Sequence, residues 1–377
     1  MSQPAAPETV PSKDRQPTPA NLLGLDYAAE AQRFGPPVVP IIDSHAHING
    51  ARATPVYRRA MDAYGVRRVY SQTQIAQAEV VRRELGERVR FVAIPEYMAE
   101  DRRRAMREGF FENMRRWHAE FGARMLKFWM APRLRDILDP GEDADIIAVD
   151  SPLRRDLAAE AVELGYMFQA HIADPDTWFA TKYADASKYG TKASHYEPLE
   201  RMLEDFHVPW LVAHMGGWPE DLEFLDGLLS RHDNLHLDTS ATKWMVRELS
   251  KHSREAFVEF IDRWKGRILF GSDIVTLDDH FEASDAHNNR FGAHQASGEA
   301  EAFDLYASRY WALRTLWERE YEGPSPIADP DLAMIDPDRY DVMSSPQLQG
   351  FALPAELLKI VYADAAEALL ERWWDEH

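Results

Sequence analysis

Short apolar runs alternate with longer stretches of helical periodicity along most of this 377-residue sequence. The runs are rich in Val, Ile, Leu and Phe, as buried parallel strands are, and the stretches between them carry apolar residues at helical spacing. Eight runs are predicted as strands, at residues 38–47, 66–73, 88–94, 123–130, 166–173, 210–215, 235–240 and 267–274. Helices are predicted between them, at residues 54–64, 74–85, 101–121, 151–165, 196–206, 219–231 and 253–264.

This alternation favours one parallel sheet whose strands are joined by crossover helices. The eight units favour a closed barrel over an open sheet, and the sequence has no glycine-rich phosphate loop of the kinds found in open sheets. The sequence therefore predicts the α/β class and a (β/α)₈ TIM-type barrel.

The segments before and after the eight units have a different character. Residues 1–35 begin with a stretch rich in Pro, Ala, Ser and Thr, and are predicted to form an extended or flexible N-terminal arm. Residues 278–297 are polar and are predicted as a loop at the mouth, followed by a helix at 299–321 and closing helices at 353–374. Residues 36–377 are therefore predicted to be a single barrel domain with a C-terminal helical extension.

The charge of the chain limits the classes of partner. It has 43 Lys and Arg against 63 Asp and Glu, a formal net charge of −20, which repels polyphosphates and anionic membrane surfaces. The sequence shows neither an apolar run of about 20 residues nor the pattern of a secretory signal at its start. We therefore expect a cytoplasmic homo-oligomer, a dimer, that binds a small-molecule substrate and neither nucleic acid nor membranes.

Two histidines stand one residue apart at the end of the first predicted strand. Side chains alternate between the two faces of a strand, so His45 and His47 are predicted to point the same way, with Asp43 on the same face. The chain contains no cysteine, so a metal ion would have to be held by His, Asp, Glu or a modified lysine. Two neutral imidazoles directed at one point form half of such a site.

Further residues of ligand type end the later strands. In a barrel of this kind the carboxyl ends of the strands face the mouth, where active sites lie. These residues are Lys127 on the fourth strand, Gln169 and His171 on the fifth, His214 on the sixth and Asp273 on the eighth. A lone histidine at a strand end is usually a hydrogen-bonded wall residue, so the prediction of a site depends on their joint order.

Four motifs resemble the amidohydrolase superfamily: Asp43-Ser44-His45-Ala46-His47, Ala213-His214-Met215-Gly216-Gly217, Leu237-Asp238-Thr239-Ser240 and Phe270-Gly271-Ser272-Asp273. Within it, the chain is similar to the amidohydrolase-related branch, family 2, which includes hydrolases together with aminocarboxymuconate-semialdehyde and resorcylate decarboxylases. The resemblance implies that His45, His47, His171 and Asp273 bind one divalent metal ion, zinc or alternatively manganese. It also implies that His214 and Asp273 are catalytic, as the groups that orient water and accept its proton.

The resemblance leaves two roles open for Lys127. In two-metal members of the superfamily a carbamylated lysine of the fourth strand bridges the ions, and Lys127, His171 and His214 fit that pattern too. We expect one metal ion, because the surrounding sequence resembles the branch that contains decarboxylases. Lys127 would then contact the substrate.

Loops after the strands carry aromatic and cationic residues, as expected for an aromatic or carboxylate-bearing substrate. A substrate-binding role is predicted for Lys127, Trp129, Arg133, Trp178, Trp218, His287 and Arg290, and Lys243 and Trp244 occupy similar positions. Our prediction is a metal-dependent hydrolase of a C–N or C–O bond in an amide, lactone or ester. The alternatives are a non-oxidative decarboxylase of an aromatic or unsaturated acid, with Arg133 or Arg290 holding the carboxylate, and a barrel that binds without turnover.

Overall fold

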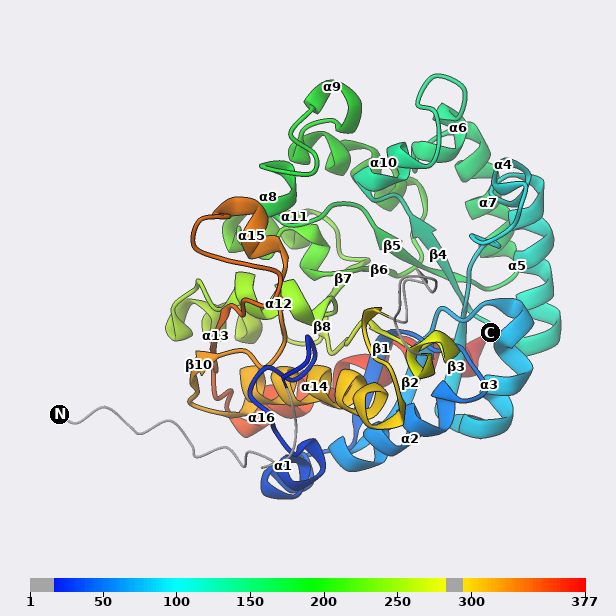
Figure 1. Cartoon of the computed structure of the whole chain (residues 1–377). Helices are drawn as coiled ribbons and strands as arrows, with labels where there is room; N and C mark the ends of the chain where they lie inside the picture. Colours follow the sequence, from blue (N-terminus) through cyan, green and yellow to red (C-terminus); the bar gives the residue numbers. More distant parts are fainter. Residues whose placement is uncertain (1–16, 283–293) are drawn as a thin grey trace.

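The computed structural model describes residues 17–282 and 294–377, so the predicted contacts of His287 and Arg290 lie outside the described residues. Within those ranges, nine parallel strands form one sheet at the centre of the molecule, with helices around it (Figure 1). The strands are β1 (Ile41–His47), β2 (Val66–Ser71), β3 (Val89–Ala93), β4 (Met125–Trp129), β5 (Met167–His171), β6 (Trp210–Val212), β7 (Leu235–Asp238), β8 (Ile268–Leu269) and β9 (Ile274–Val275).

The predicted last strand, residues 267–274, is divided in two, and the division closes the barrel. β8 pairs with β7, whereas β9 pairs with β1, so this segment joins the two ends of the sheet. Between them, the Ser44 N–H donates to the Phe270 carbonyl at 2.9 Å and the Asp273 N–H donates to the His45 carbonyl at 2.8 Å. The predicted (β/α)₈ barrel is therefore confirmed.

Seven helices cover the outside of the barrel within the described ranges: α2 (Ala53–Tyr64), α3 (Ala78–Leu85), α5 (Glu108–Phe121), α7 (Pro152–Glu163), α10 (Tyr196–Asp205), α11 (Leu222–Arg231) and α13 (Arg254–Arg263). Others lie in the connections: α4 (Arg102–Ala105), α6 (Ala144–Ile147), α8 (Asp176–Phe179), α9 (Ala186–Tyr189) and α12 (Thr242–Leu249). The start of α7 shows why the sequence predicted these boundaries. Ser151 accepts a hydrogen bond from the Arg154 N–H at 3.2 Å, and Pro152 occupies the first helical position.

The predicted C-terminal helical extension is present and closes one end of the barrel. α14 (Glu299–Glu318) packs against α2, and α16 (Ala355–Lys359) continues through two π-helical segments into α17 (Arg372–Glu376). Ala365, Ala366 and Leu370 pack against interior side chains from seven of the strands: Ile42, Tyr70, Val92, Met125, Met167, Leu211 and Leu269. Between α14 and α16 lie α15 (Asp331–Ile335) and the antiparallel pair β10 (Glu322–Pro324) and β11 (Gln347–Gln349).

The N-terminal segment differs from the predicted extended or flexible arm where it is described. Residues 27–34 form helix α1 (Tyr27–Phe34), which is capped by Asp26 and packs against α14. The Trp311 indole N–H donates to Glu30 at 2.9 Å, and Tyr27 is fully buried. This segment therefore belongs to the folded domain from α1 onward, because its apolar face is buried against a helix that lies far along the chain. In the described part of the chain, no helix is long and apolar enough to cross a membrane.

Candidate metal centre and active site

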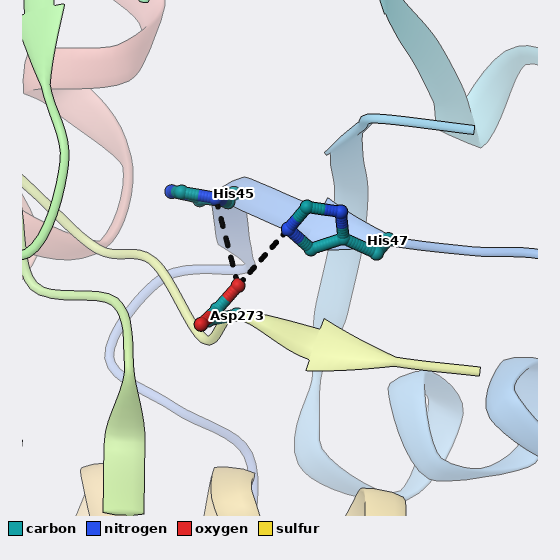
Figure 2. A group of neighbouring side chains, drawn as sticks. All are labelled: His45, His47 and Asp273. Atoms are coloured by element: carbon teal, nitrogen blue, oxygen red, sulfur yellow. Dashed lines mark ion pairs between the residues drawn. The ribbon is translucent and has the colours of Figure 1, made fainter. Parts of the chain in front are cut away.

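The ends of β1 and β8 bring three metal-ligand side chains together at the mouth. His47 Nε2 lies 3.1 Å from Asp273 Oδ1, and His45 Nε2 lies 3.6 Å from the same oxygen (Figure 2). His45 and His47 share one face of β1 because they are two residues apart, and the β8 segment places Asp273 opposite them. Their donor atoms all lie within 4.8 Å of one another.

The hydrogen bonds around His45 orient its ring for metal binding. Its Nδ1 lies 2.9 Å from Asp238 Oδ2, and its Nε2 lies 2.8 Å from the amide nitrogen of Gln72. Both bonds are satisfied when Nδ1 carries the proton and Nε2 accepts. The lone pair that a metal ion would use is therefore on Nε2, the nitrogen that faces Asp273, and in this structure it accepts from Gln72. A carboxylate that fixes the tautomer of a ligating histidine is the usual partner of such a ligand. The donor set and its orientation therefore fit a divalent metal ion.

His171 lies beside this group but is not part of it in the structure. Its Nε2 bonds to Asp174 Oδ1 at 3.0 Å, and its ring packs edge-on against the ring of His214, with 4.5 Å between centroids. Among the described residues, two groups of side chains are close enough to hold a metal ion. One is His45 with His47 and Asp273, and the other is His45 with His214 and Asp238. His171 belongs to neither group. Its predicted role as a ligand stays a prediction.

His214 is held by a short chain of hydrogen bonds at the end of β6. Its Nδ1 lies 2.8 Å from the Ser240 hydroxyl, and Ser240 in turn donates to Asp238 Oδ1. The His214 backbone N–H donates to the same Asp238 oxygen at 2.9 Å. With Nδ1–H donating to Ser240, Nε2 is the basic nitrogen of the ring, so Asp238 orients His45 and His214 together.

Burial and neighbouring charges set the ionisation of these groups. Burial, helped by the nearby His171, lowers the pKa of His214 well below its ordinary value, so the ring is neutral at neutral pH. Burial would raise the pKa of Asp273, but the bond from His47 and the nearby His45 and His214 hold it well below its usual range. The site thus pairs the ionised Asp273 carboxylate with the neutral His214 ring, the states in which such groups bind metal ions or accept protons.

Two residues of this site have backbones in the left-handed region. His214 has φ 60° and Asp273 has φ 58°, which is unfavourable for residues with a Cβ by about 1–2 kcal/mol. Both lie where a strand ends and the chain turns over the mouth. The surrounding structure therefore holds these two side chains in place at the expense of local strain.

Contrary to the prediction from the sequence, Asp43 does not share the face of His45 and His47, because the register of β1 with β2 shifts between Asp43 and Ala46. It accepts hydrogen bonds from the Ser272 hydroxyl at 2.6 Å and from the hydroxyl of Tyr310, on α14, at 2.9 Å. Burial raises its pKa to about 7, against the effect of these hydrogen bonds. Its contacts connect β1 to α14 and to the segment that carries Asp273, so it supports the site from the helix side of the strand.

A cavity of about 440 Å³ opens onto His45, His47, His171, His214 and Asp273, a size typical of small-molecule sites. Its other walls are mostly apolar and aromatic, and include Ile94, Tyr97, Met106, Trp129, Leu134, Ile137 and Val275. Lys127 is the buried cation of this cavity. Its ammonium group has no hydrogen-bond partner in the described part of the chain, and burial lowers its pKa to about 8.

The structure separates the predicted substrate residues. Lys127 and Trp129 line this cavity, and Trp178 lines a neighbouring one. Arg133 is exposed and Trp218 packs between Tyr196 and Phe224, and neither lines either cavity. The predictions for Arg133 and Trp218 therefore find no support here, because a position after a strand does not decide whether a side chain turns inward or outward.

Sequence reasoning missed Gln72 and gave Asp238 and Ser240 no role. Gln72 follows β2 directly and bonds to His45 and to Gln169, with its amide nitrogen 2.8 Å from each partner. The signal for Asp238 and Ser240 was present, since they belong to one of the four motifs and follow an apolar run at the end of the seventh strand. Their polar residue types at that position were sufficient to predict partners for the site.

Comparisons with known proteins agree with this geometry. The profile of the family described as Amidohydrolase matches residues 42–372, which include the whole barrel and most of the C-terminal helices. No curated protein matches the sequence. A search of solved structures finds Metarhizium anisopliae IDCase in apo form, with 15% identity, a TM-score of 0.33, and 67% of this chain and 76% of that chain covered. That likeness is too weak to support an argument, but the family profile spans nearly the whole chain, and the chain belongs to the amidohydrolase family.

Proposed function

We propose that this protein is a metal-dependent hydrolase that cleaves a C–N or C–O bond in an amide, lactone or ester. The substrate would be a small carboxylate-bearing or aromatic molecule. The observation that carries the proposal is the convergence of His45, His47 and Asp273 at one point beside a neutral, oriented His214. Membership of the amidohydrolase family supports an enzyme of this kind.

In this proposal His45, His47 and Asp273 hold one divalent ion, zinc in preference to manganese, with His171 as a further ligand. A bound ion of this type would lower the pKa of water from about 15.7 toward 7 and polarise the carbonyl group of the substrate. His214 would accept a proton on Nε2, since its Nδ1 already donates to Ser240. Asp238 would stabilise the protonated ring through Ser240 and would keep both histidines in position.

The cavity at the mouth supports a substrate with an apolar or aromatic part. Tyr97 and Trp129 pack edge-on at 5.5 Å between ring centroids and form one wall. Closely packed aromatic walls of this kind exclude water and hold a planar group by contact. The reacting bond would lie between this wall and the group of His45, His47 and Asp273.

A decarboxylase is the second candidate, and Lys127 is the observation that favours it. A decarboxylase has to hold a substrate carboxylate close to the site, and Lys127 is a buried cation without a partner among the described residues. Arg133, the sequence-based candidate for this anchor, is exposed. Hydrolysis remains our proposal because His214 and Asp273 supply what it requires without an additional group.

The experiment is a substrate screen with the zinc-loaded protein. One panel contains lactones, amides and esters, and the other contains hydroxybenzoates and unsaturated acids, with CO₂ release recorded separately from hydrolysis. We expect hydrolysis of at least one compound and its loss in His214→Ala. Release of CO₂ without hydrolytic turnover, abolished in Lys127→Met, would reject the hydrolase and establish the lyase.

A further inference from the structure

A second cavity, of about 490 Å³, adjoins the metal centre. Asp273 is the residue that lines both cavities. The second cavity lies between α12, α14 and the segments around residues 19–20, 328–330 and 342–343. A molecule bound in it would therefore reach the carboxylate of the proposed metal centre.

Two cations face this cavity without a carboxylate partner in the described part of the chain. Within that part, Arg309, on α14, makes one hydrogen bond, from its Nη1 to the Ser308 hydroxyl at 2.9 Å. Lys243, on α12, has neither a hydrogen-bond nor an ion-pair partner among the residues that the structure describes. Both side chains are largely withdrawn from water, and burial lowers the pKa of Arg309 to about 10 and also lowers that of Lys243.

The acidic groups closest to Lys243 are already engaged by other cations. Asp329 pairs with Arg247, and Asp331 accepts hydrogen bonds from Lys182 at 3.1 Å and from the Trp178 indole at 2.6 Å. The like charge of Arg309 adds to the effect of burial on Lys243. Two like charges at one buried cavity are unfavourable unless an anion lies near them. Asp273 is the carboxylate among the described lining residues, and it is engaged by His47, so two cations exceed the anionic charge that the lining supplies.

The rest of the lining indicates what kind of anion fits. It is mostly apolar; besides the two cations and Asp273, its polar members are Thr242, Ser272, His294 and Gln295. An inorganic anion would leave the apolar side chains without contacts, whereas an organic acid would cover them. A guanidinium also matches the two oxygens of a carboxylate, and a nearby ammonium adds a further donor.

We propose that Arg309 and Lys243 form the recognition site for a carboxylate of the substrate, and that the substrate is an organic acid whose reacting group lies beside Asp273. This assignment rests on the proposed function for the reacting bond. It defines the substrate class more narrowly, as an ester, amide or lactone that carries a free carboxylate at a second position. Arg309 and Lys243 are binding residues in this scheme, and they take no part in proton transfer.

The test measures binding separately from turnover. Zinc-loaded full-length protein is titrated by calorimetry with 3-phenylpropionate and with its uncharged counterpart, 3-phenylpropanol. We expect the acid to bind more tightly than the alcohol, and to bind about 10-fold or more weaker in Arg309→Gln and in Lys243→Gln, as for the loss of a hydrogen bond to a charged group. Binding of the alcohol is expected to be unchanged in both variants.

The control is Arg372→Gln, which removes an exposed arginine that pairs with Glu376 on α17. Arg309→Lys keeps the positive charge but replaces the guanidinium by a smaller donor group. Circular dichroism checks the fold of every variant. The proposal fails if the acid and alcohol bind equally, if folded Arg309→Gln binds the acid as the wild type does, or if Arg372→Gln weakens binding as much. If inorganic phosphate binds as tightly as the acid, the site binds anions in general, and its assignment to an organic acid is wrong.

The same variants distinguish this proposal from the proposed function. If the substrate screen finds no hydrolysis but the calorimetry behaves as expected, the carboxylate site stands and the hydrolase does not. If hydrolysis is found, kcat/KM for an ester with a free carboxylate should fall in Arg309→Gln, while kcat/KM for its uncharged analogue stays the same. Equal loss for both esters would contradict the carboxylate site and leave the hydrolase intact.

Discussion

Some side chains at the mouth would bind a metal ion, and others orient those ligands and the proposed catalytic histidine. His47 and Asp273 face each other directly at 3.1 Å. His214 is oriented by Ser240 and lies outside the group formed by His45, His47 and Asp273. This division leads to different expectations for the two kinds of substitution.

The first prediction concerns metal content. His47→Ala and Asp273→Ala should each lower both bound zinc and turnover, because each removes a direct ligand. His214→Ala should retain about one ion per chain and lose turnover. Elemental analysis of the purified variants measures this. Loss of the ion in His214→Ala, or two ions per chain in the wild type, would instead favour the two-metal arrangement with a carbamylated Lys127.

The second prediction concerns Ser240, a positioning residue. Ser240→Ala removes the hydroxyl that lies 2.8 Å from His214 Nδ1 and 3.0 Å from His45 Nδ1. His45 keeps its bond to Asp238 at 2.9 Å, so it stays oriented. We expect kcat to fall about 10–100-fold, as for other partners that orient catalytic histidines, with little change in KM or in metal content. Ser194→Ala is the control, because this exposed serine bonds only to a nearby carbonyl group. A rise in KM at constant kcat would contradict the assigned role.

At the scale of the elements, the turns after β6 and β8 place the site. Gly217 follows His214 in a short 3₁₀ segment (Met215–Gly217) with φ 80°, and a Cβ at this position would overlap the carbonyl oxygen of Ala173. The close contact joins the turn after β6 to the segment after β5. The position of His214 therefore depends on a glycine that is required both by its φ angle and by the space around it.

The third prediction compares two glycines with similar backbones. Gly266→Ala, at φ 85° with no atom within 4 Å of the new Cβ, should cost only the conformational strain, about 1–2 kcal/mol. Gly217→Ala adds a steric overlap and should be destabilising by about 1–3 kcal/mol more. Thermal unfolding of the two variants measures the difference. Equal midpoint temperatures for the two variants would show that the turn can shift to accommodate the new methyl group. The contact with Ala173 would then not constrain His214.

At the scale of the whole molecule, buried neutral histidines make stability depend on pH. The His195 Nε2–H donates to the Tyr189 carbonyl at 2.9 Å, and His280 Nδ1 lies 2.7 Å from the Tyr306 hydroxyl. Burial, reinforced by a nearby arginine, lowers the pKa of each to about 4 from the ordinary 6.5. Between these values the unfolded chain binds more protons than the folded chain does, so stability rises with pH.

The fourth prediction concerns this rise of stability with pH. The free energy of unfolding should fall as the pH is lowered from 6.5 toward 4, by up to about 1.4 kcal/mol per pH unit for each of the two histidines. Above pH 6.5 neither contributes to the slope. Urea unfolding of the wild type and of the double variant His195→Gln/His280→Gln, each at several pH values, measures this dependence. An unchanged slope in the double variant would show that other groups dominate acid unfolding.

Much of the fold follows from local patterns in the sequence. The strands and crossover helices were predictable because burial on both faces makes apolar runs, and because capping residues such as Ser151 mark where helices begin. The shared direction of His45 and His47 was predictable for an equally local reason, since strand side chains repeat every two residues. The positions of His214 and Asp273 at the mouth follow once the barrel is accepted.

Tertiary structure alone decided the contacts between distant segments. Asp238 reaches His45 across the barrel, Arg309 enters the second cavity from a helix outside the eight units, and α1 folds because α14 covers it. Trp129 ends β4 and Arg133 follows the same strand, yet Trp129 lines the cavity and Arg133 is exposed. The physical reason is that sequence periodicity specifies which face of an element is buried, whereas the partner of that face depends on how all the elements pack together.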